Sequence, residues 1–394
     1  MEQSPSKAYA ILESSILSKP RMMGTPAEEE TTRFIMDHLR GAGLAPFTED
    51  FQWSNAFVIA RKVMSSILVL WLLVFNIALR TDGPAGGIFS ILIPVLAVLF
   101  LVSLSKVIKA DKFSYLGKMS AGKNVICDVL PDSAKDPERM VYFTAHTDSV
   151  ASSMPKLSMP LTIGGYLLFM VSALLTLVGG ITRLAGSRSA LFLLILLVTS
   201  TLDSLLIIIG LFSKRVDNSP GAIDNGSGSA VLLDLAGYFH QNRPSNTALR
   251  FIFCAAEEWG LYGSKGYVRA HQEELMERAD QDLLINVDMV GSELAYVNKA
   301  GLLFRKPLNK HLNRQISEIA EREGIEARAF SSPLASNSDH APFRKLKMET
   351  AFFLSQKDTK KIHKPLDTIE KVNPQKMKDA VKLLSAVVME LDIN

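Results

Sequence analysis

The sequence has only two cysteines among its 394 residues, Cys127 and Cys254, and both lie in apolar runs typical of strands. Two thiols cannot build the disulfide framework of a small secreted protein, so we favour buried free thiols in a reducing compartment. A single bridge between them is the alternative. The chain also opens without a basic segment followed by an apolar core, so we expect that its N-terminus is not exported through a signal peptide.

An excess of charge of one sign is also lacking. Lys and Arg total 43 against 40 Asp and Glu, which leaves a net charge of +3 and gives no reason to expect a nucleic-acid partner. Because 48% of the residues are hydrophobic and 21% are charged, the composition excludes a disordered chain and indicates contact with lipid. At roughly 150 residues per domain, the length alone predicts two or three domains.

Long hydrophobic runs are present. Four stretches carry almost no charge, at 63–79, 88–105, 157–182 and 189–213. The length of each stretch is close to that of a membrane-spanning helix, which needs about 20 residues. For the first stretch, a buried core helix is the alternative. Short Gly-containing segments join them in two pairs, which predicts two helical hairpins that each leave and re-enter on one side. Asp203, within the last stretch, is either functional or paired with neighbouring hydroxyl groups.

The basic residues that flank these stretches indicate on which side the rest of the chain lies. Eight basic residues lie at the hairpin ends that join the rest of the chain, namely Arg61, Lys62, Lys106, Lys109, Lys112, Lys156, Lys214 and Arg215. Three lie at the hairpin tips, namely Arg80, Arg183 and Arg188. Because Lys and Arg in short flanks tend to stay cytoplasmic, the remaining chain is predicted to be cytoplasmic.

Outside the four stretches, strand-like and helix-like segments alternate, as in an α/β domain with a largely parallel sheet. Strands are predicted in KNVICDVLP, MVYFTAHTD, LRFIFCAAEE, DLLINVDMVG and METAFFLSQ, and helices at 25–42, 227–242, 262–278, 307–323 and 373–391. Removing about 60 residues for each hairpin leaves roughly 270, which suits one domain. We therefore expect one α/β domain over 1–56, 119–155 and 216–394, interrupted by hairpins at 57–118 and 156–215.

Candidate functional residues follow the predicted strands. His146 and Asp148 come at the end of one strand, two residues apart, so both side chains can point the same way. A metal-bound imidazole is commonly oriented by a carboxylate, which would make His146 a ligand and Asp148 its partner; a surface histidine is the alternative. Asp224 lies in a Gly-rich turn before a helix, where an aspartate is most often only an N-cap.

Further carboxylates and histidines follow later strands. Glu257 and Glu258 directly follow one apolar strand and Asp288 another, and carboxylates at the edge of a core need cations or a solvated site. Neighbouring side chains of an extended chain diverge, so one glutamate can bind metal while the other faces a substrate water. Later polar loops contribute Asp339, His340, His363 and Asp367. Imidazole and carboxylate ligands without thiolates indicate a two-metal hydrolytic site for Zn²⁺, with Mn²⁺ or Co²⁺ as substitutes.

The order and wording of these motifs, HTDS, PGAIDNGSG, CAAEEWG, NVDMVG and IHKPLDT, resemble the M28 family of co-catalytic zinc exopeptidases. This family includes bacterial leucyl aminopeptidases and glutamate carboxypeptidase-like and glutaminyl cyclase-like relatives. The resemblance covers nearly all of the chain outside the hairpins. It implies a three-layer zinc-exopeptidase domain with a mixed, mostly parallel central sheet. The chain departs from the family pattern in the four predicted transmembrane helices, which are inserted in this domain as two hairpins.

The resemblance also implies a role for each residue. His146 and Asp288 would hold one zinc, Glu258 and His363 the other, and Asp224 would bridge both. Glu257 resembles the general base that takes a proton from a water shared by the two zincs, and Asp148 the aspartate behind His146.

One choice is not fixed by the residues themselves, because His340 in SDHAPF is as good a ligand as His363 in IHKPLDT. The family pattern favours His363 and makes SDHAPF a supporting loop, which continues from the segment Phe330–Asn337 that is expected to shape the substrate pocket. Asn337, Asp339 and His340 in this loop are predicted to contact substrate. Because the second hairpin begins near His146, the active site is expected near the membrane surface.

The most favoured function is a membrane-embedded dizinc aminopeptidase with a peptide substrate, because the zinc region is acidic and no arginine cluster suggests a carboxylate pocket. The alternatives are a carboxypeptidase, a glutaminyl cyclase-like single-zinc acyltransferase, and a non-catalytic membrane scaffold on the same fold. We expect a multi-pass membrane protein with four spans, a cytoplasmic catalytic domain and no nucleic-acid partner. Its transmembrane helices could also form a homo-oligomer.

Overall fold

The computed structural model describes residues 7–109, 117–132, 137–154, 156–187, 189–301, 304–332 and 337–393. Lys112 and Arg188, both counted above as flanking cations, and residues 333–336 of the loop before SDHAPF lie outside the described residues. The chain divides into two compact units. The first comprises 1–53, 120–151 and 216–394, and the second comprises 54–119 and 152–215.

The first unit is built on one large mixed sheet. Its strands are β1 (Phe47–Ser54), β2 (Met119–Val129), β3 (Arg139–His146), β6 (Thr247–Cys254), β7 (Leu283–Val287), β8 (Leu294–Ala300), β9 (Lys306–Pro307), β10 (Ala327–Ser332) and β11 (Glu349–Phe353). Their order is β1-β2-β6-β3-β7-β11-β8-β10, with β9 beside β8. The central strands β6, β3, β7 and β11 run parallel, whereas β2 pairs antiparallel with β6 and β8 with β11. Two short strands, β4 (Ala151–Ser152) and β5 (Arg215–Val216), pair separately.

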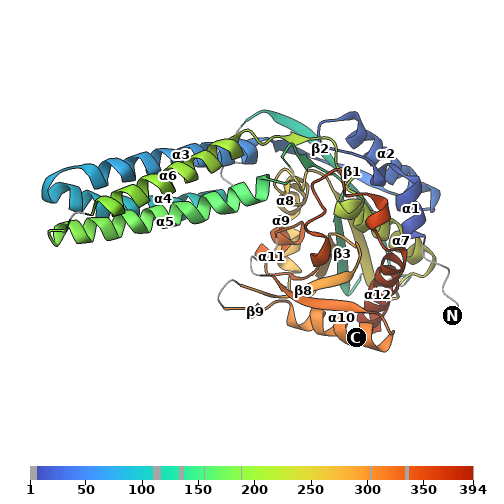
Figure 1. Cartoon of the computed structure of the whole chain (residues 1–394). Helices are drawn as coiled ribbons and strands as arrows, with labels where there is room; N and C mark the ends of the chain where they lie inside the picture. Colours follow the sequence, from blue (N-terminus) through green and yellow to red (C-terminus); the bar gives the residue numbers. More distant parts are fainter. Residues whose placement is uncertain are drawn as a thin grey trace. The chain divides into compact units, whose positions relative to one another are not determined.

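Helices cover both faces of this sheet (Figure 1). Those packed on the larger core are α1 (Ala8–Ser14), α2 (Pro26–Gly41), α7 (Gly228–Gln241), α10 (Lys310–Arg322) and α12 (Pro374–Ile393). Those on the other face are α8 (Tyr262–Ala270), α9 (Gln272–Glu277) and α11 (His340–Lys345). Short η segments lie at Ile16–Ser18, Ala222–Ser227, Gln356–Asp358 and Ile369–Lys371.

Side chains alternate between the two cores along the central strands, as a pleated strand requires. In β3, Val141 and Phe143 join the larger core, whereas Tyr142 joins the smaller one. The predicted fold class, a mixed and mostly parallel α/β domain, is thereby confirmed. Cys127 and Cys254 are buried and unbridged, as favoured from the sequence.

The second unit consists of four long helices, α3 (Ala56–Arg80), α4 (Gly83–Lys109), α5 (Ser158–Leu184) and α6 (Ala190–Leu211). All four are long and apolar enough to cross a membrane. They pack around a small apolar centre that includes Leu72, Phe75 and Phe169. Only 28% of the apolar window of α3 is buried, so α3 is not the buried core helix considered as an alternative.

The structure corrects several predicted elements. The single helix predicted at 262–278 is two helices, α8 and α9, which meet at His271. The strands β1, β8 and β10 and the helices α1 and α11 were not predicted.

Candidate metal centre

The candidate ligands meet because parallel strands bring their carboxyl ends to one edge of the sheet. His146 is the last residue of β3, Glu258 follows β6, and Asp288 follows β7. β3 pairs in parallel with both β6 and β7, so the three strand ends are neighbours. Ligands of α/β proteins commonly lie at this edge. Asp224 reaches it from the turn before α7, and His363 from the loop between β11 and α12.

These five side chains form two groups that share Asp224. In the first, His146 Nε2 lies 3.0 Å from Asp224 Oδ1 and 3.5 Å from Asp288 Oδ1. In the second, His363 Nε2 lies 3.3 Å from Asp224 Oδ2 and 3.0 Å from Glu258 Oε1. The ligand atoms of each group lie within 4.8 Å of one another, as the ligands of one metal ion must. Each oxygen of Asp224 thus faces a different group, which is the arrangement of a bridging carboxylate.

The charge balance of the site fits two divalent cations. Asp224, Glu258 and Asp288 offer three carboxylates to two imidazoles, and Asp224 and Asp288 are buried. Buried carboxylates are costly unless they are paired or bound to metal. Burial lowers the pKa of His146, but Asp148, Asp224 and Asp288 hold it well above the usual value. In the absence of metal, a proton on His146 therefore takes the place of a cation.

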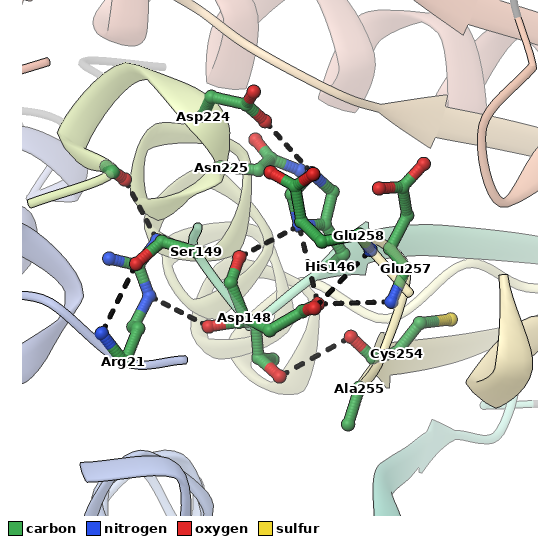
Figure 2. Close-up of polar contacts among 12 residues, drawn as sticks. Arg21, His146, Asp148, Ser149, Asp224, Asn225, Cys254, Ala255, Glu257 and Glu258 are labelled. Carbon is green, nitrogen blue, oxygen red and sulfur yellow. Dashed lines mark hydrogen bonds and ion pairs between the residues drawn. The ribbon is translucent and has the colours of Figure 1, made fainter. Parts of the chain in front are cut away.

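Asp148 lies beside His146 and also supports the two glutamates. The imidazole Nδ1 of His146 lies 3.0 Å from the backbone carbonyl of Asp148, and 3.7 Å from its carboxylate (Figure 2). A proton on Nδ1 donated to that carbonyl leaves Nε2 free to face the metal group. The carboxylate of Asp148 also accepts hydrogen bonds from the backbone N–H groups of Glu257 and Glu258, at 3.0 and 3.3 Å. Asp148 thus fixes the backbone on which both glutamates stand.

Glu257 belongs to neither ligand group. Figure 2 shows the carboxylate of Glu257 beside that of Glu258. Burial raises the pKa of Glu257 well above its usual value, and the nearby carboxylates of Asp288 and Glu258 raise it further. A carboxyl group with a raised pKa beside a metal site is suited to taking up and returning a proton.

Two residues around Asp224 were not singled out from the sequence. The buried side chain of Asn225 donates to Val287 O at 2.8 Å and accepts from Met289 N at 3.0 Å, on either side of Asp288. The buried Arg21 donates to the carbonyl oxygens of Thr147, Pro220 and Gly221 at 2.7, 2.6 and 2.8 Å. The bonds of Arg21 join the loops that carry His146 and Asp224. In the sequence, Asn225 could have been noticed because it follows Asp224. Nothing in the sequence pointed to Arg21.

Asp367, proposed from the sequence only as part of a polar loop, supports Asp224 directly. Its carboxylate accepts from the backbone N–H groups of Ile223 and Asp224 at 2.7 and 3.3 Å. The helix α7 begins only at Gly228, so Asp224 is not its N-cap.

The three residues predicted to contact substrate are not alike. Asn337 is exposed, whereas Asp339 and His340 are 0% and 2% exposed. The ring of His340 stacks on Phe352 with centroids 4.3 Å apart, and His340 joins neither ligand group. Burial raises the pKa of Asp339 to about 7. The geometry therefore favours His363 over His340 as the second histidine ligand, and it leaves Asn337 as the one accessible residue of the three.

Comparison with known proteins agrees with this geometry. The model of peptidase family M28 matches residues 181–388. Aminopeptidase YwaD of Bacillus subtilis (strain 168) is 33% identical over 180 residues, which cover 44% of this chain and 38% of the relative. Leucine aminopeptidase 2 of Trichophyton rubrum is 40% identical over 86 residues, which cover 22% of this chain and 17% of the relative. The chain thus spans well under half the length of these relatives.

Two solved structures share the fold at low sequence identity. The zinc aminopeptidase BSAP from Bacillus subtilis aligns with a TM-score of 0.54 and 18% identity, over 97% of this chain and 94% of that one. A glutaminyl cyclase from an Acidobacteriales bacterium aligns with a TM-score of 0.55 and 14% identity, over 100% and 98% of the two chains. Since the family model matches more than half of the chain, the chain belongs to peptidase family M28.

Proposed function

We propose that this chain is a membrane-embedded dizinc aminopeptidase with a peptide substrate. The observation that carries the proposal is the shared carboxylate of Asp224, whose two oxygens face two separate groups of ligand atoms. The similarity to an aminopeptidase from Bacillus subtilis and to a solved zinc aminopeptidase supports the same activity. His146, Asp224 and Asp288 would hold one zinc, and Asp224, Glu258 and His363 the other.

The chemistry divides between the metal and the protein. Zinc in such a site supplies a Lewis acid that polarises the scissile carbonyl and lowers the pKa of water. Glu257, which belongs to neither group of ligands, would take the proton of the attacking water and return it to the leaving amine. Asp148 holds the backbone of Glu257 and thereby fixes where that carboxylate stands.

A free amino terminus suits the site better than a free carboxylate. The ligand groups and Glu257 make the site acidic. Arg21, the cation close to Asp148, Asp224 and Glu258, is buried and donates to backbone carbonyls. It is therefore not available to a substrate carboxylate. The proposal is tested with amino-acid anilides and with N-blocked peptides: cleavage of the anilides is expected, whereas cleavage of only the blocked peptides would contradict the aminopeptidase assignment.

The role of Glu257 gives a sharper test. Glu257→Gln is expected to bind two zinc ions yet lose orders of magnitude in turnover, whereas Asp224→Asn is expected to lose zinc as well, because Asp224 contributes to both groups. Zinc per chain is measured by elemental analysis and turnover with an anilide. Glu318→Gln, on the exposed face of α10, serves as the control. Normal turnover in Glu257→Gln would refute the assigned role.

A glutaminyl cyclase is the second candidate, because solved glutaminyl cyclases share the fold. It would use a single zinc, whereas two complete groups of ligands favour two. One zinc per chain, with cyclisation of an N-terminal glutamine, would support this candidate instead. A non-catalytic scaffold is disfavoured because both ligand groups and Glu257 are present.

The membrane assignment rests on α3, α4, α5 and α6, which expose apolar side chains such as Leu70, Leu167 and Leu191. We propose that these four helices cross the bilayer as two hairpins and that the peptidase unit is cytoplasmic. Association of these helices into a homo-oligomer is part of the same proposal.

A further inference from the structure

A cavity of about 120 Å³ lies in the four-helix unit, between the end of α3, the end of α5 and the start of α6. Its polar lining includes Arg80 on α3, Arg183 on α5, and Ser187 and Ser189 before α6. Its apolar lining includes Leu79 and Phe192. Two arginines and three hydroxyl side chains, with Thr182 as the third, thus line a cavity at one end of a largely apolar bundle.

Arg183 is held in place but keeps an unused donor. Its side chain is only 9% exposed. One guanidinium nitrogen, Nη1, donates to the carbonyl oxygen of Leu79 at 2.7 Å. The other, Nη2, is buried and makes no hydrogen bond to any described residue. Nη2 of Arg183 lies 3.6 Å from a carboxylate oxygen of Asp82, and the side chain of Asp82 is 87% exposed. A buried donor without an acceptor is costly, so this position calls for an anionic ligand.

Arg80 adds a second positive charge. It is the last residue of α3, and its Nη1 donates to Asn76 Oδ1 at 3.1 Å, on the preceding turn. Arg80 also lines the cavity. The two positive charges of Arg80 and Arg183 exceed the single negative charge of Asp82.

The start of α6 supplies a third favourable feature. Ser189 is the N-cap, and its hydroxyl oxygen accepts from Phe192 N at 3.3 Å. The N–H groups of the first helical turn have no partner within the helix, and the helix dipole makes this end positive. A helix N-terminus beside an arginine is a familiar environment for a phosphate group.

We propose that this cavity binds the phosphate group of a membrane phospholipid. The proposal rests on the membrane crossing proposed above, because the ends of spanning helices lie at the level of the lipid headgroups. The cavity is smaller than the 300 to 1,000 Å³ or so that a whole drug-sized ligand fills. It therefore admits the phosphate group, while the acyl chains would lie outside along the apolar surface of the bundle.

Binding is tested on the full chain, purified in non-ionic detergent and delipidated. The probes are dioctanoyl phosphatidic acid, inorganic phosphate and dioctanoylglycerol, followed by calorimetric titration. We expect phosphatidic acid to bind, dioctanoylglycerol not to bind, and inorganic phosphate to bind at least about tenfold more weakly, since it lacks the apolar contacts. Equal affinity for phosphatidic acid and inorganic phosphate would contradict the lipid assignment. Equal affinity for phosphatidic acid and dioctanoylglycerol would contradict a phosphate site.

Variants locate the site. Arg183→Gln and Arg80→Gln are each expected to weaken the binding of phosphatidic acid about tenfold, as the loss of one charged hydrogen bond predicts. Arg314→Gln, at an exposed position on α10, removes the same charge elsewhere and serves as the control. Because Arg183 also supports Leu79, Arg80→Gln provides the variant that leaves this buried bond intact. Wild-type affinity in a folded Arg80→Gln and Arg183→Gln double variant would overturn the site.

A separate measurement distinguishes this inference from the membrane proposal. Extraction of whole membranes with alkaline carbonate releases peripheral proteins but leaves spanning chains in the pellet. A chain that is released refutes the membrane crossing, whereas a chain that is retained but binds phosphatidic acid without Arg80 and Arg183 refutes the phosphate site alone.

Discussion

At the scale of single residues, Arg21 is the side chain that ties the centre together. Burial lowers its pKa to about 10, although the surrounding Asp367 and Asp148 raise it, so the guanidinium is charged at neutral pH. It donates to the carbonyls of Thr147 and Gly221, one beside His146 and one in the loop before Asp224, which are two of the three ligands of the first group. Arg21 is therefore a positioning residue rather than a catalytic one.

This role predicts a loss of metal affinity. In Arg21→Gln, the glutamine side chain cannot donate to all the carbonyl oxygens that Arg21 contacts. We therefore expect zinc affinity to fall about 10-fold to 100-fold, as is usual when groups that orient metal ligands are removed. Zinc affinity is measured by competition with a chromogenic chelator. Arg33→Gln, at an exposed position on α2, is the control. Wild-type zinc affinity in a folded Arg21→Gln protein would show that Arg21 has only a structural role.

Ligand residues were easier to predict than the residues that position them. His146, Glu258 and Asp288 follow apolar runs, and a charge directly after a buried strand stands out. Arg21 has no such signal, because it recognises backbone carbonyls, and these are present at every residue. The choice between His340 and His363 needed the family pattern, since both follow similar polar residues. The geometry then separates them, because only His363 approaches Glu258.

At the scale of elements, the start of α7 is packed tightly against the end of β7. A methyl group on Gly228 would lie 2.3 Å from Val287 O and 2.3 Å from Asn225 Oδ1. Val287 precedes the ligand Asp288, and Asn225 follows the ligand Asp224. The close approach of this helix to this strand thus sets the spacing of two ligands.

Gly228→Ala is accordingly expected to destabilise the protein by about 1–3 kcal/mol, the usual cost of overpacking a core. It should also weaken zinc binding, because the ligand loops must separate. The thermal unfolding midpoint with and without zinc measures both effects. At Gly41, the last residue of α2, no atom lies within 4 Å of an added methyl group, so Gly41→Ala is the control. A Gly228→Ala midpoint equal to that of Gly41→Ala would contradict the packing argument.

Elements with a clear hydrophobic pattern were predicted, and those without one were missed. β7 is fully buried and reads as the continuous run LLINV, whereas β1 reads FTEDFQWS and is buried only towards its end. β1 and β10 are the outer strands of the main path through the sheet, and outer strands carry polar side chains that weaken the pattern. The break between α8 and α9 at His271 has no proline or glycine to mark it.

At the scale of the whole molecule, the hydrophobic excess of the composition is concentrated in α3, α4, α5 and α6. The length suggested two or three ordinary domains, whereas one α/β unit is assembled from three separate parts of the chain. Composition identified the apolar helices because each is about as long as the bilayer core is thick. It could not identify the cavity beside Arg183, which depends on how three helices meet.

The proposed orientation gives a prediction for the whole chain. A phosphatase reporter that is active only outside the cytoplasm should be inactive when fused after α12 and active when inserted at the tip between α5 and α6, because the positive charges favour a cytoplasmic peptidase unit. A green fluorescent reporter at the same positions should give the opposite pattern and serves as the control. Phosphatase activity of the fusion after α12 would reverse the orientation.

The insertion of two hairpins within one unit also orders the events of biogenesis. A ribosome completes β3 and His146 before α5 and α6, and only afterwards the parts that carry Asp224, Glu258, Asp288 and His363. Under the proposed membrane crossing, a nascent chain holds no member of the ligand set when α3 and α4 enter the bilayer, and only His146 when α5 and α6 enter it. Hydrolysis must await translation through His363, so the proposed peptidase would be delivered to its membrane in an inactive form without needing an inhibitory propeptide.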